Sequence, residues 1–132
     1  MPSLVVAVPY IAILGLLAAL HTVRVILNRV RSGVNAGDGG DIGLTRAIRA
    51  HGNFVEQAPI ALILIATAEI TGARSLTITV LCLALLAARL ASAMALSRSV
   101  DQSGLRQFSG GLSILVLVAA SVAVLLALAG VK

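Results

Sequence analysis

Four long apolar runs divide the sequence, and most polar residues lie between them. The runs cover about residues 4–23, 54–71, 76–96 and 111–131. Each comes close to the roughly 20 apolar residues that an α-helix needs to cross a bilayer. The pattern therefore predicts an all-α integral membrane protein, a bundle of four transmembrane helices that forms one domain over residues 1–132.

The composition supports this prediction. Hydrophobic residues make up 59% of the 132 residues, charged residues make up 11%, and the mean hydropathy is +1.07. A soluble domain of this size is far less apolar. Small residues occur in every span, which favours close helix packing and a homo-oligomer. The first apolar run follows no basic segment and is long enough to span, so we expect a retained helix rather than a cleaved signal peptide.

The net charge of +5 comes mainly from arginine. Of the nine arginines, eight lie between Arg24 and Arg49 or between Arg89 and Arg106. There is no long basic run and there are few aromatic residues for base stacking, so we expect no nucleic-acid partner. The positive-inside rule instead places the two Arg-rich connections in the cytoplasm and both termini outside.

A polar stripe runs along the predicted second helix where it enters the membrane. At 100° per residue, Arg46, Arg49, Asn53 and Glu56 fall within an arc of roughly 80°. Such groups are costly in hydrocarbon unless they face protein, water or a ligand. Anchoring at lipid headgroups would explain the two arginines alone. The deeper amide and carboxylate favour a ligand-binding site.

A similar stripe marks the first helix, where His21, Arg24, Asn28 and Arg31 recur at helical spacing. The two stripes could line one cavity if their helices are neighbours. Glu69 lies off the second-helix stripe, and we predict that it forms a solvated helix end.

Two other residues have alternative interpretations. Arg89, within the third span, could extend to the interface, pair with Glu56 across the bundle, or contact a ligand. Arg106 could anchor the fourth helix, or could stabilise the thiolate of a bound thiol. Cys82, the single cysteine, lies in an apolar run and is interpreted as a small buried hydrophobe.

The stripe on the second helix resembles the signature of the MAPEG proteins, the membrane-associated proteins in eicosanoid and glutathione metabolism. The matching residues are Arg46, Arg49-Ala50-His51-x-Asn53-x-x-Glu56 and Pro59, followed by a long apolar run. The loop Gly37-Asp38-Gly39-Gly40 is similar to that of bacterial members. The resemblance implies a homotrimer of four-helix bundles in the inner membrane, with glutathione bound near the cytoplasmic side between neighbouring subunits.

The resemblance also implies roles for individual residues. The expected glutathione-binding residues are Arg24, Arg46, Arg49, Asn53, Glu56 and Arg89. Arg106 corresponds to the arginine that activates the thiol in some members, and it is the candidate catalytic residue. Glutathione would be a co-substrate, and no metal is implied.

Two departures from the family pattern concern the ligand. Members with eicosanoid or transferase activity often carry an arginine where Gly52 stands, and a tyrosine at the third-helix position that corresponds to Leu96. We expect a glutathione transferase or peroxidase that acts on lipophilic electrophiles from the bilayer. The alternative is a noncatalytic membrane scaffold or lipid-binding protein that keeps the stripe as a structural ion-pair network. A transporter is disfavoured because the spans include no pair of discontinuous helices.

Overall fold

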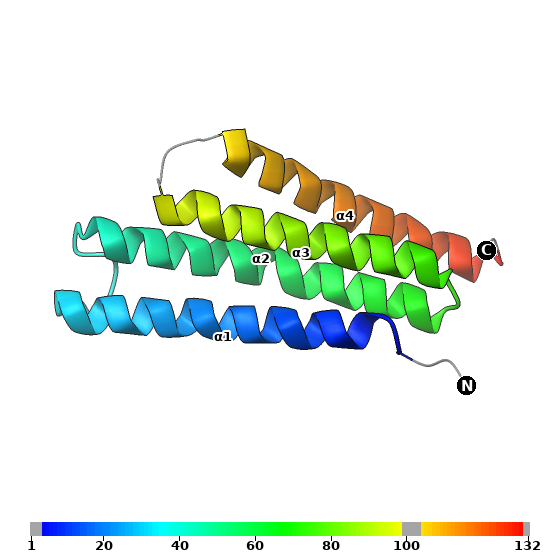
Figure 1. Ribbon diagram of the computed structural model, residues 1–132, viewed down its shortest axis with the longest axis horizontal. Helices are drawn as coiled ribbons and strands as arrows, with labels where there is room; N and C mark the ends of the chain where they lie inside the picture. The colour runs from blue at the N-terminus through cyan, green and yellow to red at the C-terminus, as the bar shows by residue number, and fades with distance from the viewer. Residues whose placement is uncertain (1–3, 99–103, 131–132) are drawn as a thin grey trace.

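The computed structural model describes residues 4–98 and 104–130, which form four helices and no strand (Figure 1). The helices are α1 (Ala7–Ser32), α2 (Ile42–Ile70), α3 (Ser75–Arg98) and α4 (Gly104–Leu128). Each is long and apolar enough to cross a membrane. The predicted all-α bundle of four membrane-spanning helices is confirmed.

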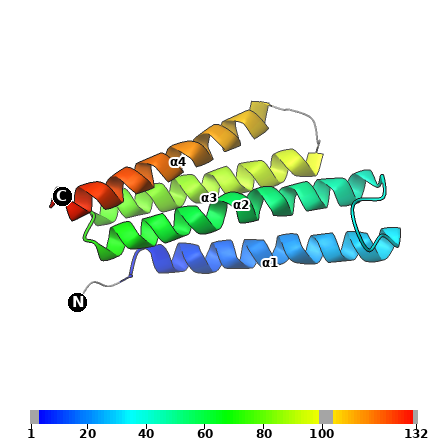
Figure 2. The ribbon, with the colours of Figure 1, turned by 180° about the vertical axis from the view of Figure 1, so that it is seen from behind.

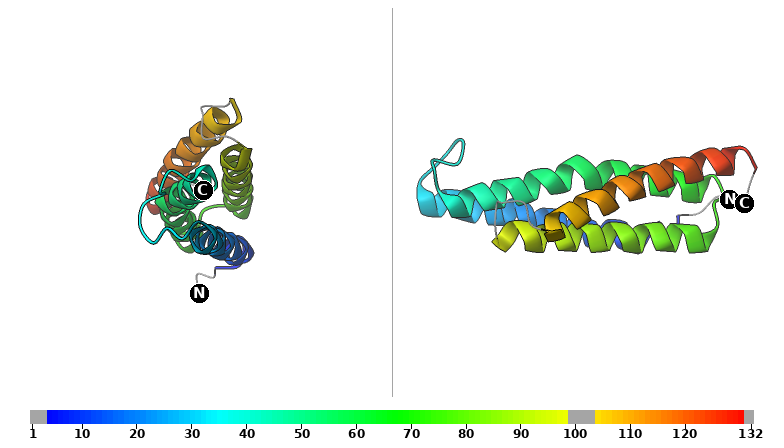
Figure 3. Two further views of the ribbon diagram at one scale, coloured as in Figure 1. Left: turned by 90° about the vertical axis from the view of Figure 1, so that its left-hand side faces the viewer. Right: turned by 90° about the horizontal axis from the view of Figure 1, so that it is seen from above.

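The helices run up and down, with α2 and α3 at the centre of the bundle. Helix α2 contacts the other three helices. Within the described residues, α1 and α4 do not contact each other. Figure 3 shows α1 and α4 on opposite sides of the central pair. The α1–α2 loop and the start of α4 lie at one end, here called the Arg-rich end. The start of α1, the α2–α3 turn and the end of α4 lie at the other, the terminal end (Figure 2).

The polar stripe is helical along its whole length because α2 begins well before the predicted second span. Asp41 is the N-cap, and its carboxylate accepts a hydrogen bond of 2.6 Å from the backbone N–H of Leu44. Gly33 ends α1 with φ 67°, a left-handed conformation that glycine adopts without strain. From its N-cap at Asp41, α2 extends from the Arg-rich end through Pro59 to the terminal end.

Small residues let the helices pack closely. The buried alanines of α2 are Ala47, Ala50, Ala58, Ala61 and Ala68. Larger core side chains from the other helices fill the space around them, among them Leu14 and Leu85. Cys82 is in this core at 0% exposure, so its interpretation as a buried hydrophobe is confirmed. Many Leu, Val and Ile side chains point outwards, as expected for a surface that faces lipid.

Glu69 closes the terminal end of the bundle. Its Oε1 accepts hydrogen bonds from the backbone N–H groups of Val5 (2.7 Å) and Val6 (2.6 Å), and its Oε2 accepts one from Ala7 (2.9 Å). These N–H groups belong to the start of α1, which has no side-chain cap of its own. A carboxylate is also favoured there by the helix dipole. The prediction that Glu69 is merely a solvated helix end is wrong, because its carboxylate caps another helix.

Candidate ligand-binding site

Two pockets open near the Arg-rich end, on different sides of α2. The Glu56 pocket has a volume of about 390 Å³ and is lined by Ile48, Arg49, Gly52, Asn53, Glu56, Leu96 and Arg106. The Arg46 pocket has a volume of about 480 Å³ and is lined by Leu20, Val23, Arg24, Leu27, Asn28, Arg31, Gly43, Arg46 and Ser97. The structure thus brings four predicted site residues together in the first pocket and two in the second.

Helical geometry explains why residues of one stripe line two pockets. Arg46 and Arg49 are three residues apart, so their directions differ by about 60° around the helix axis. Arg46 lies at the edge of the stripe nearest α1, and Arg49 lies at the edge that also carries Glu56. The expectation that both stripes line one cavity is confirmed only in part. Arg46 lines the Arg46 pocket together with the first-helix stripe, whereas Arg49, Asn53 and Glu56 line the Glu56 pocket.

The Glu56 pocket combines charges of both signs. Arg49 and Glu56 are exposed in it, and Arg106 is half-buried at the start of α4. The Glu56 carboxylate curls back along α2, because its Oε1 lies 4.0 Å from the position that a Cβ on Gly52 would take. Leu96 supplies an apolar wall from α3. Two guanidinium groups and one carboxylate suit a ligand that carries carboxylates and an ammonium group.

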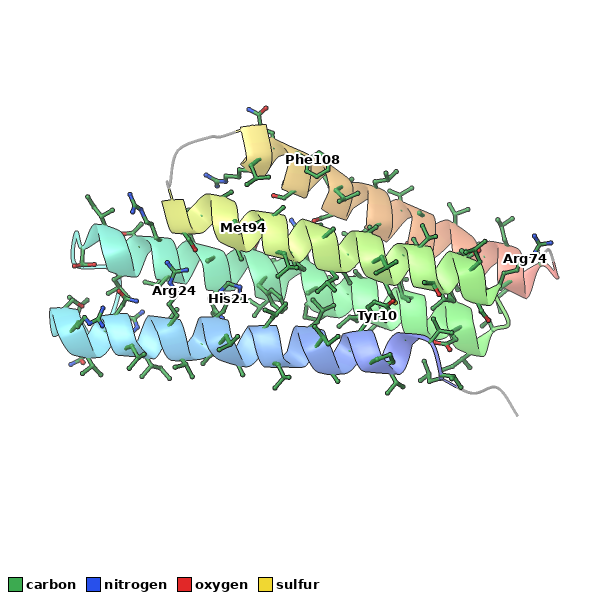
Figure 4. All side chains as sticks on the ribbon, in the orientation of Figure 1. Tyr10, His21, Arg24, Arg74, Met94 and Phe108 are labelled. Carbon is green, nitrogen blue, oxygen red and sulfur yellow. The ribbon has the colours of Figure 1, made fainter. Side chains whose placement is uncertain are left out.

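The Arg46 pocket is basic. Arg24 extends from α1 towards the neighbouring helices (Figure 4) and donates from Nη1 to Ser97 Oγ at 2.7 Å. Asn28 donates from Nδ2 to the backbone carbonyl of Arg24 at 2.7 Å. The buried Nε of Arg46 has no hydrogen-bond partner within the described chain. Such a surface suits an anionic group that supplies acceptors.

Arg89 lies inside the bundle and lines neither pocket. Its side chain is 2% exposed, and it donates from Nη1 to the backbone carbonyl of Asn53 at 3.0 Å and to Asn53 Oδ1 at 3.1 Å. Its Nη2 donates to Gln57 Oε1 at 2.8 Å and to Ser113 Oγ. All of these acceptors are neutral, and within the described residues no ion pair joins Arg89 to Glu56. A direct contact between Arg89 and a ligand stays a prediction.

Sequence reasoning missed two members of this network, Gln57 and Ser113. Signals for both are present in the sequence. Gln57 is four residues after Asn53, so the polar stripe extends by one turn on the same face. Ser113 is four residues after Ser109 where the fourth helix becomes mostly apolar, and such a repeat indicates a polar contact inside a bundle.

No group of three or more His, Cys, Asp or Glu side chains suited to a metal ion occurs within residues 4–98 and 104–130. The polar side chains that line the two pockets carry guanidinium, amide, carboxylate and hydroxyl groups.

Comparison with known proteins places this sequence in a family. The family model described as "MAPEG family" matches residues 7–126. The relatives include a protein named "Inner membrane protein YecN" in Escherichia coli strain K12, and one of the same name in a second Escherichia coli strain. Each is 38% identical over 81 residues, which is 61% of this chain and 62% of the relative. The chain thus spans about 62% of the length of the relatives it matches.

No solved structure matches this chain. The family model, however, covers nearly the whole sequence, including every residue of both pockets and of the Arg89 network. The chain belongs to the MAPEG family.

Proposed function

We propose that this protein binds glutathione, or a related anionic thiol, in the Glu56 pocket and uses it to conjugate or reduce lipophilic electrophiles from the bilayer. The main support is the convergence of Arg49, Glu56 and Arg106 in one pocket from two helices far apart in the sequence. Membership of a family associated with glutathione metabolism supports the identity of the ligand.

The chemistry of glutathione matches the pocket group by group. Arg49 binds a carboxylate through two parallel hydrogen bonds, and Glu56 binds the ammonium group. Arg106 stabilises the thiolate, which is the nucleophilic form of the thiol. In a conjugation, the thiol proton passes to solvent, the thiolate sulfur forms the new bond to the electrophilic carbon, and the leaving group departs with its electron pair. In the reduction of a hydroperoxide, two glutathione thiols are oxidised to a disulfide, and the O–O bond breaks to give an alcohol and water. Holding the two reactants together supplies further acceleration.

The Arg46 pocket would contribute to the ligand site in an oligomer. The family resemblance implies a homotrimer with glutathione between subunits. In such a trimer the Arg46 pocket of one subunit would face the Glu56 pocket of its neighbour, and Arg24 and Arg46 would complete the anion site. We place the protein in the inner membrane, as the name of its Escherichia coli relatives suggests, with the Arg-rich end in the cytoplasm.

The competing hypothesis is a noncatalytic scaffold or lipid-binding protein. It requires the stripe to form a structural ion-pair network. Against it, Arg89 bonds only neutral oxygens among the described residues, and Glu56 is exposed in a pocket. The replacement Glu56→Gln separates the two hypotheses. Weaker glutathione binding with an intact oligomer supports the ligand site, whereas a loosened oligomer with no change in binding supports the scaffold.

The first experiment is calorimetry of glutathione binding to the purified protein in detergent. Arg49→Ala should weaken binding roughly 10-fold or more, because a charge-assisted hydrogen bond is lost from an exposed side chain that the fold does not need. Arg74→Ala is the matched control, since Arg74 is an exposed arginine at the terminal end (Figure 4). Arg106→Ala should leave binding largely intact but lower the thiolate absorbance of the bound ligand. Absence of saturable binding at millimolar glutathione would contradict the proposal.

A further inference from the structure

The side chain of Asn53 is held from inside the bundle. Its Oδ1 accepts hydrogen bonds from Arg89 Nη1 at 3.1 Å and from Ser92 Oγ at 2.7 Å. The backbone carbonyl of Asn53 accepts a further bond from the same guanidinium at 3.0 Å. Arg89 is 2% exposed and Ser92 is 5% exposed, so both donors are inside the protein.

The donors fix which end of the Asn53 amide faces inwards. A guanidinium carries only donors, so the amide atom that meets Arg89 has to be the oxygen. The bonds from Arg89 and Ser92 together occupy both lone pairs of that oxygen. The NH₂ group, on the other branch of the amide, is then left for the Glu56 pocket, which Asn53 lines.

The burial of Arg89 inside the bundle needs a physical explanation. A cation in the middle of a membrane bundle is costly, and apolar residues of similar volume usually stabilise a core at least as well. Here the charge is accommodated by neutral oxygens of Asn53, Gln57 and Ser113. Two of these three side chains are on α2, on the same stripe as the pocket residues. The network therefore connects the core directly to the pocket.

We infer that Arg89 is a positioning residue: with Ser92, it turns the Asn53 amide so that its NH₂ group donates to an acceptor on the bound ligand. Arg89 acts through Asn53 and does not need to touch the ligand. The ligand group at this point is a carboxylate or an amide carbonyl, and an ammonium group is excluded from it. The inference rests on the proposed function only for the identity of the ligand.

The sharpest test is Asn53→Asp. The aspartate has the same shape, and one of its oxygens keeps the bonds from Arg89 and Ser92. The other oxygen then offers the pocket an acceptor where the wild type offers a donor. Glutathione affinity should fall roughly 10-fold or more. The melting temperature of the free protein should stay the same or rise, because Arg89 gains a counter-ion. A merely structural role for Asn53 predicts no loss of affinity in a variant that remains stable.

A second variant tests the positioning contact without changing a pocket residue. Ser92→Ala removes one of the two bonds to Asn53 Oδ1, so glutathione should bind roughly 3- to 10-fold more weakly. Ser121→Ala is the matched control, because Ser121 donates to the backbone carbonyl of Leu117 on α4 and lines neither pocket. Its affinity should equal that of the wild type.

The orientation of Asn53 can also be tested without any ligand. The chain contains three asparagines, Asn28, Asn35 and Asn53, so nitrogen-15 asparagine labelling gives three resolvable side-chain NH₂ signals. In the free protein, Ser92→Ala should shift the Asn53 signal and leave the other two in place. In the wild type, added glutathione should shift that same signal.

These measurements separate this inference from the proposed function. If the wild type binds no glutathione, the proposed function fails, while a shift of the Asn53 signal in free Ser92→Ala still supports the positioning contact. The inference is overturned if that signal does not move, or if Asn53→Asp binds glutathione as tightly as the wild type.

Discussion

Helix α2 carries two glutamates, Glu69 at the terminal end and Glu56 halfway along the helix, and their surroundings differ. Glu69, at the terminal end, accepts three backbone hydrogen bonds from the start of α1. Glu56, at the midpoint of α2, is exposed in a pocket with Arg49 and Arg106. The same residue type in the same helix thus caps a neighbouring helix at the terminal end and lines an open pocket halfway along.

The difference comes from what the neighbouring helices bring to each carboxylate. At the terminal end, α1 begins beside Glu69 and offers N–H groups that no intrahelical carbonyl can satisfy. Halfway along α2, Arg49 and Arg106 bring guanidinium groups on long side chains to the pocket that Glu56 lines. Fixed backbone donors suit a structural contact, whereas cationic side chains around a pocket suit an anionic ligand.

The largest expected effect is the loss of stability in Glu69→Ala. The substitution leaves three N–H groups at the start of α1 without acceptors, at a cost on the order of 1–3 kcal/mol for each group that water cannot reach. Unfolding in detergent, followed by circular dichroism, should show a much lower transition midpoint. The folded fraction should still bind glutathione with the affinity of the wild type.

Glu56→Ala is the matched control for this experiment, because it removes the same side chain from the same helix. It should leave the unfolding midpoint nearly unchanged and weaken glutathione binding. If Glu56→Ala proved as destabilising as Glu69→Ala, the distinction between a structural glutamate and a pocket glutamate would be lost.

A smaller effect is expected for Gly52→Arg, which adds a cation to the Glu56 pocket. A Cβ at this position would meet only Glu56 Oε1, at 4.0 Å, so the backbone has room for a side chain to start there. The extra guanidinium should raise the affinity for glutathione about 2- to 5-fold, the range of an exposed charge pair. Calorimetry at two salt concentrations would measure it, since screening should reduce the gain.

Gly52→Ala is the control for Gly52→Arg. Both substitutions remove a glycine from the interior of α2 and should stabilise the helix by roughly 0.5–1 kcal/mol. Only the arginine variant should bind more tightly. Equal affinity in the two variants would indicate that the pocket does not recognise an anion at this point.

The smallest effect concerns Asp38, in the α1–α2 loop. Hydrogen bonds from the backbone N–H of Gly40 and the hydroxyl of Thr45 lower the pKa of the Asp38 carboxyl below its usual 3.8. Because the folded-state pKa is lowered, the stabilisation is fully present above the unfolded value and is lost as the pH falls through the folded value. Asp38→Asn should therefore melt slightly lower than the wild type at neutral pH.

Melting of the wild type and of Asp38→Asn in acid provides the control. Once the pH falls below the lowered pKa of Asp38, the melting curves of the wild type and of Asp38→Asn should coincide. A difference that persists unchanged in acid would show that the carboxylate charge is not what orders the loop.

The sequence predicted the four helices and the polar stripe because both depend on local rules. A membrane requires about 20 apolar residues for each helix, and helical periodicity places Arg49, Asn53 and Glu56 on one face wherever the helix is packed. Arg106 is a candidate because it lies at the start of the fourth span, and the family resemblance adds its specific role. Its presence in the same pocket agrees with that expectation.

Contacts between helices could not be predicted in the same way. The partner of Glu69 is the start of α1, more than sixty residues away along the chain, and the capping depends on how α1 packs against α2. The acceptors of Arg89 come from α2 and α4, so they depend on the rotation of three helices. The separation of Arg46 from Arg49 depends on where α1 meets α2. Hydropathy constrains none of these rotations.

Cys82 has a practical consequence for mapping the protein in its membrane. The one cysteine of the chain is fully buried among core side chains, where a charged maleimide cannot reach it. The wild-type chain is therefore its own unreactive background for thiol labelling. A cysteine introduced at Asn35, in the α1–α2 loop, or at Arg74, in the α2–α3 turn, would report from one known end of the bundle. Labelling of intact cells against opened ones would then assign each end to a side of the membrane without any change to the core.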